Sequence, residues 1–350
     1  MNFILVLFFC IPVNGFLYMK QGDPPKLWSF VSSNMKESAR NWFIGRATKL
    51  GIPWKSLTDP YEKNQEALEA IKAQYENTSI LYPNYYSQPF HGYDHGNLEW
   101  KAAFEAEAAT LSISANYWDN ISPHLAEQWL RQNATQRIQL YRQKLGLAPF
   151  ESILDMGCST GISTQFLKQR FPYSHVLGVD LSPYFISTAV YQSVAKLDNN
   201  YFMHANIEDV PLPHESFDMI SIQFVLHEVP YENCLNILRE AYRLLKQDGV
   251  LCIMDLNPKI LQERFQENKF RLWAFEATEP HIYEYYQQNM VHSLEQCGFN
   301  YIEEYPNDPL NALYLATKSG VQVQCDYSFP RRYFFGNIPD NKKKLTLVFT

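Results

Sequence analysis

The sequence lacks the patterns that define several classes of protein. Its six cysteines include no C-x-x-C pair, so they predict neither a zinc site nor a disulfide framework. Thirty basic residues stand against 37 acidic ones, a formal charge of −7, which argues against a nucleic-acid partner because phosphate binding needs a basic face. The apolar run Phe3–Val13 is too short to span a bilayer. We therefore expect no bound metal and a small-molecule partner rather than nucleic acid.

A third glycine is also missing from the most informative stretch of the chain. Residues 152–156 have the pattern of a buried strand, and Gly157 and Gly161 follow it in the order Asp155-x-Gly-x-x-x-Gly. A dinucleotide-binding turn needs G-x-G-x-x-G, and a carboxylate repels phosphate. The pattern favours a nucleoside with a positively charged amino-acid tail. A nicotinamide-dependent oxidoreductase is the less favoured rival, and a tight turn without any ligand is the simplest alternative.

Further strands and polar residues follow in an order typical of a nucleotide-binding domain. Residues 175–181 form a second predicted strand with Asp180 near its end, where a carboxylate can accept hydrogen bonds from ribose hydroxyls. Residues 201–207 predict a third strand, and residues 217–229 predict a fourth strand with its exit. In open α/β sheets the ligand lies beyond the carboxyl ends of the strands, so the segment from Gln223 to Glu228 is expected under the methyl donor or beside the acceptor. The segment 244–250 predicts a helix end and a turn on Gly249 before a strand at 250–256.

This order of motifs resembles the class I S-adenosylmethionine-dependent methyltransferases over residues 150–320, and most closely the small-molecule group of quinone and sterol methyltransferases. The resemblance implies an α/β fold with a Rossmann-like, doubly wound, seven-stranded sheet. The strands at 299–305 and 312–318 would form its antiparallel last pair. It also implies S-adenosyl-L-methionine as cofactor, with Asp155 supporting the methionine amino group and Asn206 and Ile207 flanking adenine. The expected cofactor-binding residues are Asp155, Gly157, Cys158, Gly161, Asp180, Leu181, Asn206, Ile207 and Gln223.

The domain organisation has four expected parts: residues 1–20, 21–148, 149–320 and 321–350. The first is an apolar segment for which a signal or organelle-targeting role is slightly favoured over a membrane anchor or a buried strand. A cytoplasmic location is the alternative. Residues 21–148 are a helical accessory and lid segment, and 149–320 are the cofactor-binding domain. No role is assigned to the C-terminal extension.

The accessory segment contains one predicted amphipathic helix and one polar helix. Apolar residues recur at helical spacing from Val31 to Leu50, with basic residues on the other face. Such a helix suits association with a membrane surface, but packing on the catalytic domain fits the pattern equally well. Residues 62–77 predict a second, polar and exposed helix.

An aromatic loop at residues 82–100 is the most unusual block outside the predicted domain. It resembles a block in methyltransferase-like proteins of cyanobacteria and plastids, and this resemblance implies no particular substrate. We expect it to close an acceptor pocket; a hydrophobic seam against the domain is the alternative. Metal binding by His91 and His95 is disfavoured because glycines break the helix that would align them. The expected substrate-binding residues are Tyr86, Phe90, His91, Tyr93 and Asn97.

His227 and Glu228, directly after the fourth strand, are the expected catalytic residues. A neutral imidazole at His227 would take the acceptor's proton, and Glu228 would orient it or act as the base. Capping of the helix that starts near Pro230 is the structural alternative. The 15% aromatic content favours an apolar or aromatic acceptor such as a lipid, a quinone or another metabolite. The sequence thus predicts a methyltransferase, with a catalytically silent cofactor-binding or assembly module as the alternative function.

Overall fold

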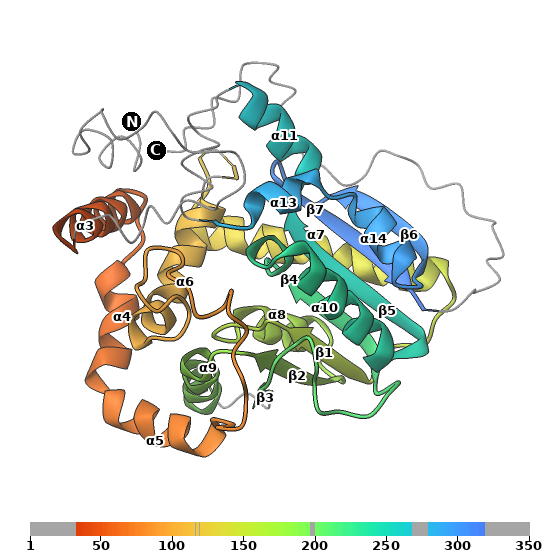
Figure 1. The fold of residues 1–350 in the computed structure, drawn as a ribbon, viewed down its shortest axis with the longest axis horizontal. Coiled ribbons are helices and arrows are strands. Elements are labelled where there is room, and N and C mark those ends of the chain that lie inside the picture. The colour runs from red at the N-terminus through yellow and green to blue at the C-terminus, as the bar shows by residue number, and fades with distance from the viewer. Residues whose placement is uncertain (1–32, 116, 119, 197–199, 268–278, 319–350) are drawn as a thin grey trace.

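A computed structural model describes residues 33–115, 117–118, 120–196, 200–267 and 279–318 (Figure 1). Its centre is a seven-stranded sheet of order β3-β2-β1-β4-β5-β7-β6. Strands β1 to β5 run parallel, whereas β7 is antiparallel to both β5 and β6. The predicted α/β, doubly wound sheet is confirmed. The strands are β1 (Ser152–Met156), β2 (His175–Asp180), β3 (Tyr201–His204), β4 (Phe217–Gln223), β5 (Leu245–Leu256), β6 (Asn300–Pro306) and β7 (Asn311–Thr317).

Helices cover both faces of the sheet. Figure 1 shows α10 and α14 in front of the strands and α7 behind them. The chain passes from β1 to β2 and β3 on one side and then returns to place β4 on the other, so the order reverses between β1 and β4. Ligands of such sheets bind at this reversal. The helices from residue 123 onward are α7 (Pro123–Lys144), α8 (Ile162–Arg170), α9 (Pro183–Lys196), α10 (Tyr231–Leu244), α11 (Pro258–Glu267), α13 (Ile282–Gln287) and α14 (Met290–Gln296), of which α11 packs on α13.

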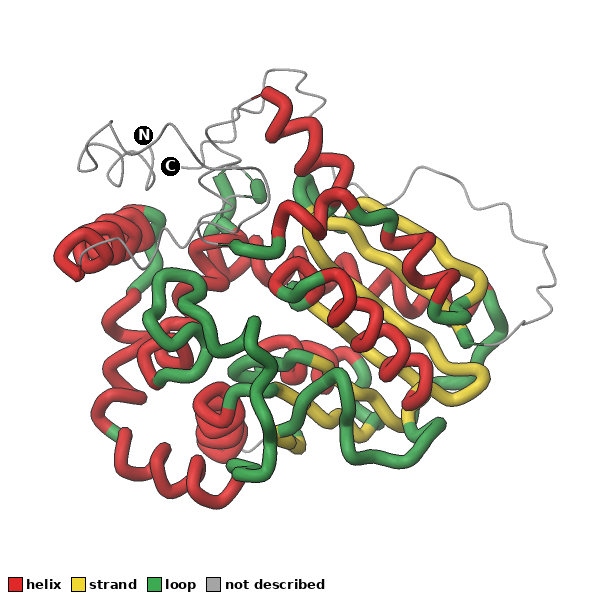
Figure 2. The backbone as a smooth tube through the Cα atoms, viewed as in Figure 1, coloured by secondary structure: helices red, strands yellow, loops and turns green. Residues whose placement is uncertain are grey.

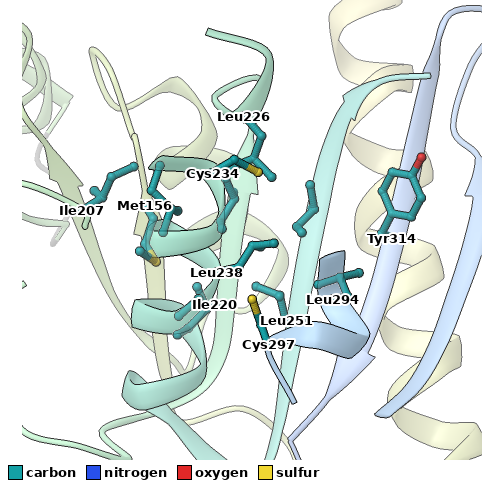
Figure 3. Packing of buried hydrophobic residues seen from close by; sticks show 14 of the residues in the cluster. Met156, Ile207, Ile220, Leu226, Cys234, Leu238, Leu251, Leu294, Cys297 and Tyr314 are labelled. Atoms are coloured by element: carbon teal, nitrogen blue, oxygen red, sulfur yellow. The ribbon is translucent and has the colours of Figure 1, made fainter. Parts of the chain in front are cut away.

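The two faces of the strands build two separate cores. Ile220 of β4 and Leu251 of β5 are paired neighbours that pack against Leu238 of α10, as Figure 3 shows. The alternate residues of β5, such as Cys252, face the opposite way and pack with Ile138 of α7. Apolar residues on both faces are what a central, helix-covered strand requires. The sheet is therefore a rigid base for the loops at its carboxyl ends.

Four N-terminal helices pack beside this sheet rather than apart from it. They are α3 (Ser33–Lys49), α4 (Trp54–Lys63), α5 (Gln65–Tyr75) and α6 (Trp100–Ser114). Helix α5 lies on α9, and α6 contacts both α9 and α7. In α3, the buried Ala47 packs with Trp54 and Leu111. This agrees with the expectation that the helix packs within the protein, which was the alternative to association with a membrane surface. Among the described residues, no helix combines the length and apolar composition needed to cross a bilayer.

Several element boundaries differ from the sequence prediction. The expected helix 62–77 is divided at Asn64, and it is not simply exposed, since Leu68 is fully buried. Strand β3 ends at His204 instead of residue 207. Strand β5 begins at Leu245, before the predicted turn on Gly249, and its register with β4 shifts there. The predicted segments 1–20 and 321–350, as well as Cys10 and Cys325, lie outside the described residues.

Candidate active site

A cavity of about 620 Å³ lies at the carboxyl ends of β1, β2 and β4. Its size falls within the range of about 300–1,000 Å³ that is usual for small-molecule sites. One part is lined by the turn after β1, and another by the loop 85–97, which Figure 2 draws as part of the green connection between α5 and α6. The N-terminal helices α3 and α6 also contribute to its wall. The predicted domain and the accessory segment therefore share one site.

The turn after β1 brings backbone close to the exit of β4. Gly157 has φ 76°, and a Cβ there would lie 2.4 Å from Cγ2 of Val225. Gly161 has φ 83° and is the N-cap of α8. Both positions need glycine because a side chain would be strained in the left-handed region. Among the residues expected to bind the cofactor in this turn, Gly157 and Cys158 line the cavity, together with Ser159 and Thr160.

Asp155 is placed differently from the sequence expectation. Its carboxylate is completely buried on the α8 side of the sheet, where Ser163 and Thr164 donate hydrogen bonds to Oδ2 at 2.6 and 2.7 Å. It does not line the cavity. Burial raises the pKa of Asp155, although these two hydrogen bonds act in the opposite direction. The residue thus anchors the first turn of α8 to β1 and does not lie where it could directly contact a methionine amino group.

Asp180 lies on the cavity wall at the end of β2, with Leu181 next to it. Backbone N–H groups of Ser159 and Ser182 donate to its two carboxylate oxygens, each at 2.8 Å. Each oxygen keeps a further lone pair for a ligand hydroxyl. Burial raises the pKa of Asp180 to about 6, so the carboxylate is ionised at neutral pH. This geometry suits the predicted ribose contact.

Asn206, Ile207 and Gln223 also line the cavity. Oδ1 of Asn206 accepts a hydrogen bond from the backbone of Glu208 at 3.0 Å, so its side chain shapes the loop after β3. Oε1 of Gln223 accepts a bond from Arg131 of α7 at 2.6 Å, and Nε2 donates to Ser221. Arg131, which the sequence reasoning missed, thereby fixes Gln223 at the edge of the cavity.

Cys158 is a buried free thiol on the cavity wall. Burial raises the pKa of its thiol well above the usual value, with the nearby carboxylates of Asp180 and Asp155 adding to the effect. A protonated thiol is a poor nucleophile. Cys158 is therefore suited to be a small wall residue rather than a nucleophile.

His227 is not the neutral base that the sequence predicts. It lies in a short 3₁₀ turn, Leu226–Glu228, and its Nδ1 is 2.6 Å from Oδ1 of Asp255. Burial alone would lower the pKa of His227, but the Asp255 carboxylate outweighs it and raises the pKa to about 10. At neutral pH the ring is an imidazolium, which has no lone pair to take a proton. Asp255, rather than Glu228, orients the ring.

Glu228 lines the cavity beside a second imidazole–carboxylate pair. His91 Nε2 lies 2.7 Å from Oε1 of Glu279 and 3.9 Å from Oε1 of Glu228. Burial raises the pKa of Glu228 to about 7, whereas His91 and His227 oppose the rise. Burial disfavours the charged form of His91, yet Glu279 outweighs this and raises the pKa of the ring. A carboxylate with a pKa near 7 is suited to accept a proton at neutral pH.

The aromatic loop contributes all five of its predicted residues to the cavity wall. Tyr86 is near both Asp180 and Glu228, whose charges add to burial in raising the pKa of its hydroxyl. The Tyr93 hydroxyl donates to Glu105 of α6 at 2.9 Å, which ties the loop to the N-terminal helices. The loop reverses by a backbone bridge between Phe90 and Tyr93. The five residues are Tyr86, Phe90, His91, Tyr93 and Asn97.

Within the part of the chain that the structure describes, no group of three or more His, Cys, Asp or Glu side chains is arranged to hold a metal ion. His91 contacts carboxylates instead. Nor do His227 and Glu228 cap the next helix, whose N-cap is Pro230 without a side-chain hydrogen bond.

The turn and its surroundings fit S-adenosylmethionine. Gly157 leaves space that a Cβ would fill, and Asp180 offers free lone pairs on the same wall. Oγ1 of Thr160, buried in the turn, has no hydrogen-bond partner among the described residues, which leaves a polar atom for a ligand. Asp180 and the turn 157–161 would hold the nucleoside, with Asn206, Ile207 and Gln223 around it.

Comparison with known proteins agrees with this geometry. Residues 154–253 match the family model described as methyltransferase domain. The chain is 34% identical over 106 residues to the demethylmenaquinone methyltransferase of Listeria monocytogenes serotype 4a (strain HCC23), covering 30% of this chain and 44% of that protein. It is 29% identical over 173 residues to the demethylmenaquinone methyltransferase of Tropheryma whipplei (strain Twist), covering 44% of this chain and 69% of that protein. The chain thus spans less than half the length of the Listeria relative.

Solved structures with a similar arrangement are more distant. A methyltransferase from Methanosarcina mazei has a TM-score of 0.41 at 19% identity, covering 51% of this chain and 97% of that one. The phosphoethanolamine N-methyltransferase 2 of Haemonchus contortus, in complex with S-adenosyl-L-methionine, has a TM-score of 0.42 at 13% identity, covering 63% and 60%.

The sheet, the turn at its reversal point and the family match define a methyltransferase domain. Residues 154–253 thus match a methyltransferase domain in sequence, their fold agrees with the class I S-adenosylmethionine-dependent resemblance of the sequence motifs, and the residues of the turn fit S-adenosylmethionine as cofactor.

Besides Arg131, the sequence reasoning missed two further residues of the site. Asp255 could have been found, because it ends the strand next to β4 and is an acidic residue at the carboxyl edge of a parallel sheet. Glu279 has no comparable local signal, since only the fold brings it to His91.

Proposed function

We propose that this chain transfers a methyl group from S-adenosylmethionine to a small apolar or aromatic acceptor that binds under the loop 85–97. The observation that carries the proposal is the single cavity shared by Asp180, the aromatic loop and Glu228. The cofactor supplies an electrophilic methyl group on a positively charged sulfur. The chain's own residues position the two reactants and exclude water, which accounts for much of the catalysis in such displacements.

The acceptor side of the cavity supports an aromatic or apolar partner. Phe90, Tyr93 and Phe224 offer ring faces, and Leu256 and Leu261 add aliphatic surface. Aromatic walls favour flat acceptors, which stack on them. The curated relatives are demethylmenaquinone methyltransferases, so a quinone is one acceptor to test.

Label transfer from tritium-labelled S-adenosylmethionine into lipid and quinone extracts tests this function. The full-length chain should label an organic-soluble product. Phe90→Ala should lower the transfer by about tenfold, as expected for losing roughly 1.5 kcal/mol of apolar contact, while leaving cofactor affinity unchanged. Tyr173→Ala is the matched control, because Tyr173 is 96% exposed and outside the cavity.

Three results would contradict the proposal. They are label found only in polar products, equal transfer by the Phe90 and Tyr173 variants, and cofactor binding without transfer into any extract. The last of these would point to the catalytically silent binding module.

A further inference from the structure

The acceptor side of the cavity contains an unusual set of charged groups. Three carboxylates, Glu228, Glu279 and Asp255, lie close to two imidazoles, His91 and His227. Two of the carboxylates are each paired with one imidazole, at 2.6 Å for His227–Asp255 and 2.7 Å for His91–Glu279. Such buried pairs are costly to assemble unless geometry and hydrogen bonds compensate for lost water. Their presence on the cavity wall therefore indicates a chemical role.

Glu228 differs from the other two carboxylates. Its closest basic atom is Nε2 of His91 at 3.9 Å, beyond hydrogen-bond distance, and its side chain is 25% exposed. No hydrogen bond engages its carboxylate within the described ranges. It lines the cavity, so a ligand can reach it. Glu228 is thus a carboxylate that faces the cavity without a hydrogen-bond partner among the described residues.

Asp255 holds His227 in one orientation. Besides the ring nitrogen, Asp255 accepts hydrogen bonds from the backbone of Leu226 at 2.9 Å and of Leu256 at 2.7 Å, and it is fully buried. With Nδ1 directed at Asp255, the other ring nitrogen, Nε2, has no partner in the described part of the chain. His227 lines the cavity next to Glu228, so a positive ring and an available carboxylate are adjacent there.

This part of the cavity also lies close to the donor side. The Tyr86 hydroxyl is near enough to both Asp180 and Glu228 for each to act on its ionisation. Glu279 also lines the cavity and is only 8% exposed. Its Oε2 atom has no hydrogen-bond partner among the described residues, which favours a polar ligand here. A buried unpaired oxygen of this kind calls for a partner.

We propose that the acceptor carries a weakly acidic hydroxyl, as in a phenol or an enol, that Glu228 is the base for this hydroxyl, and that His227, oriented by Asp255, stabilises the oxyanion. This inference rests on the proposed function and specifies its acceptor. The hydroxyl proton moves to a carboxylate oxygen of Glu228. The oxygen's electron pair forms the new bond to the methyl carbon, and the pair of the breaking carbon–sulfur bond returns to sulfur.

The charges around Glu228 set the direction of this step. His91 and His227 favour its ionised form, whereas Glu279, Asp255 and burial favour the protonated form, and the pKa of Glu228 is about 7. The imidazolium of His227 favours an anionic oxygen next to it, because a positive charge stabilises an oxyanion in a site shielded from water.

The dye 4-nitrophenol tests the assignment without turnover, because its phenolate is coloured and its phenol is not. At a pH one unit below the dye's own pKa, the full-length chain should bind it in the coloured form. Glu228→Gln, which resembles the protonated acid that prevails at this pH, should keep the coloured complex but lower label transfer into the organic-soluble product by about tenfold at pH 7.5, with the loss shrinking as the pH rises. His227→Gln should bind the dye without colour at the pH of the dye test.

The same experiments include a control variant and can give results that contradict the assignment. Glu232→Gln, an exposed glutamate at the start of α10, should behave like the parent chain. A colourless complex with the parent, no dye binding, equal label transfer by the Glu228 and Glu232 variants, or tighter binding of benzylamine than of the dye would each overturn the assignment. Binding of S-adenosylmethionine, measured on the same samples, reports separately on the proposed function.

Discussion

At the scale of single residues, a neighbour decides what His227 can do. The sequence places a histidine after the fourth strand, and a free imidazole would be neutral near pH 7. Asp255 at 2.6 Å changes this by stabilising the protonated ring, and the pKa rises to about 10. This is why we propose Glu228, whose pKa is about 7, as the base.

The His227–Asp255 pair predicts a pH-dependent contribution to stability. The pKa of His227 is raised in the folded chain, so its contribution is complete below the unfolded value of about 6.5 and is lost as the pH rises toward 10. His227→Gln should destabilise the chain by about 3–5 kcal/mol at pH 6 and clearly less at pH 9.5. Urea unfolding at several pH values measures the difference.

His214→Gln, at an exposed position, is the control and should show almost no change at any pH. A deficit of the His227 variant that stays constant or grows with pH would contradict the assigned protonation state.

The sequence predicts individual site residues best where a strand end positions them. Asp180 and Gln223 end strands that the apolar pattern reveals, and both line the cavity. The position of Asp155 near the end of a strand was also predicted correctly. The side of the sheet to which its carboxylate points, however, depends on the pleat of the strand and on contacts with α8. Such orientation is a property of the folded sheet.

At the scale of elements, the turn between β1 and α8 determines the shape of the donor side. Gly157→Ala should destabilise the chain by about 1–3 kcal/mol, because its φ of 76° is unfavourable for alanine and its Cβ would meet Val225 at 2.4 Å. It should also weaken cofactor binding. Denaturant midpoints and a cofactor titration measure the two effects.

Gly45→Ala provides the contrasting variant for this prediction. Gly45 lies inside α3 with no atom within 4 Å of the added Cβ, so alanine should stabilise the chain by about 0.5–1 kcal/mol. Equal stability of the Gly157 variant and the parent would show that the turn is not constrained as described.

Element types were more predictable than their ends. Strand β1 has the predicted bounds, because the apolar run sets its start and the glycine that follows sets its end. Strand β3 ends at His204, whose ring contacts the backbone of Asn77 and of Leu181. Two residues later, the side chain of Asn206 forms a turn with the backbone of Glu208. The contacts of His204 join residues distant in sequence, so no local pattern shows them.

At the scale of the whole molecule, the cavity exists because two parts of the chain meet. The sheet provides Asp180, His227 and Glu228, and the N-terminal segment provides the aromatic loop. His91 on this loop pairs with Glu279 beyond β5, a contact that only the complete fold creates. The donor side could be predicted from motifs in one stretch, whereas the acceptor side required the structure.

The most direct test of the account is a calorimetric titration of the full-length chain with S-adenosylmethionine, with oxidised and reduced nicotinamide dinucleotides as comparison ligands. We predict that only S-adenosylmethionine binds, and that Asp180→Ala weakens it by about 10- to 100-fold through the loss of hydrogen bonds to a charged group. Asp209→Ala, an exposed aspartate outside the cavity, should bind like the parent. Absence of binding, equal affinity of the two variants, or binding of a dinucleotide instead would contradict the account.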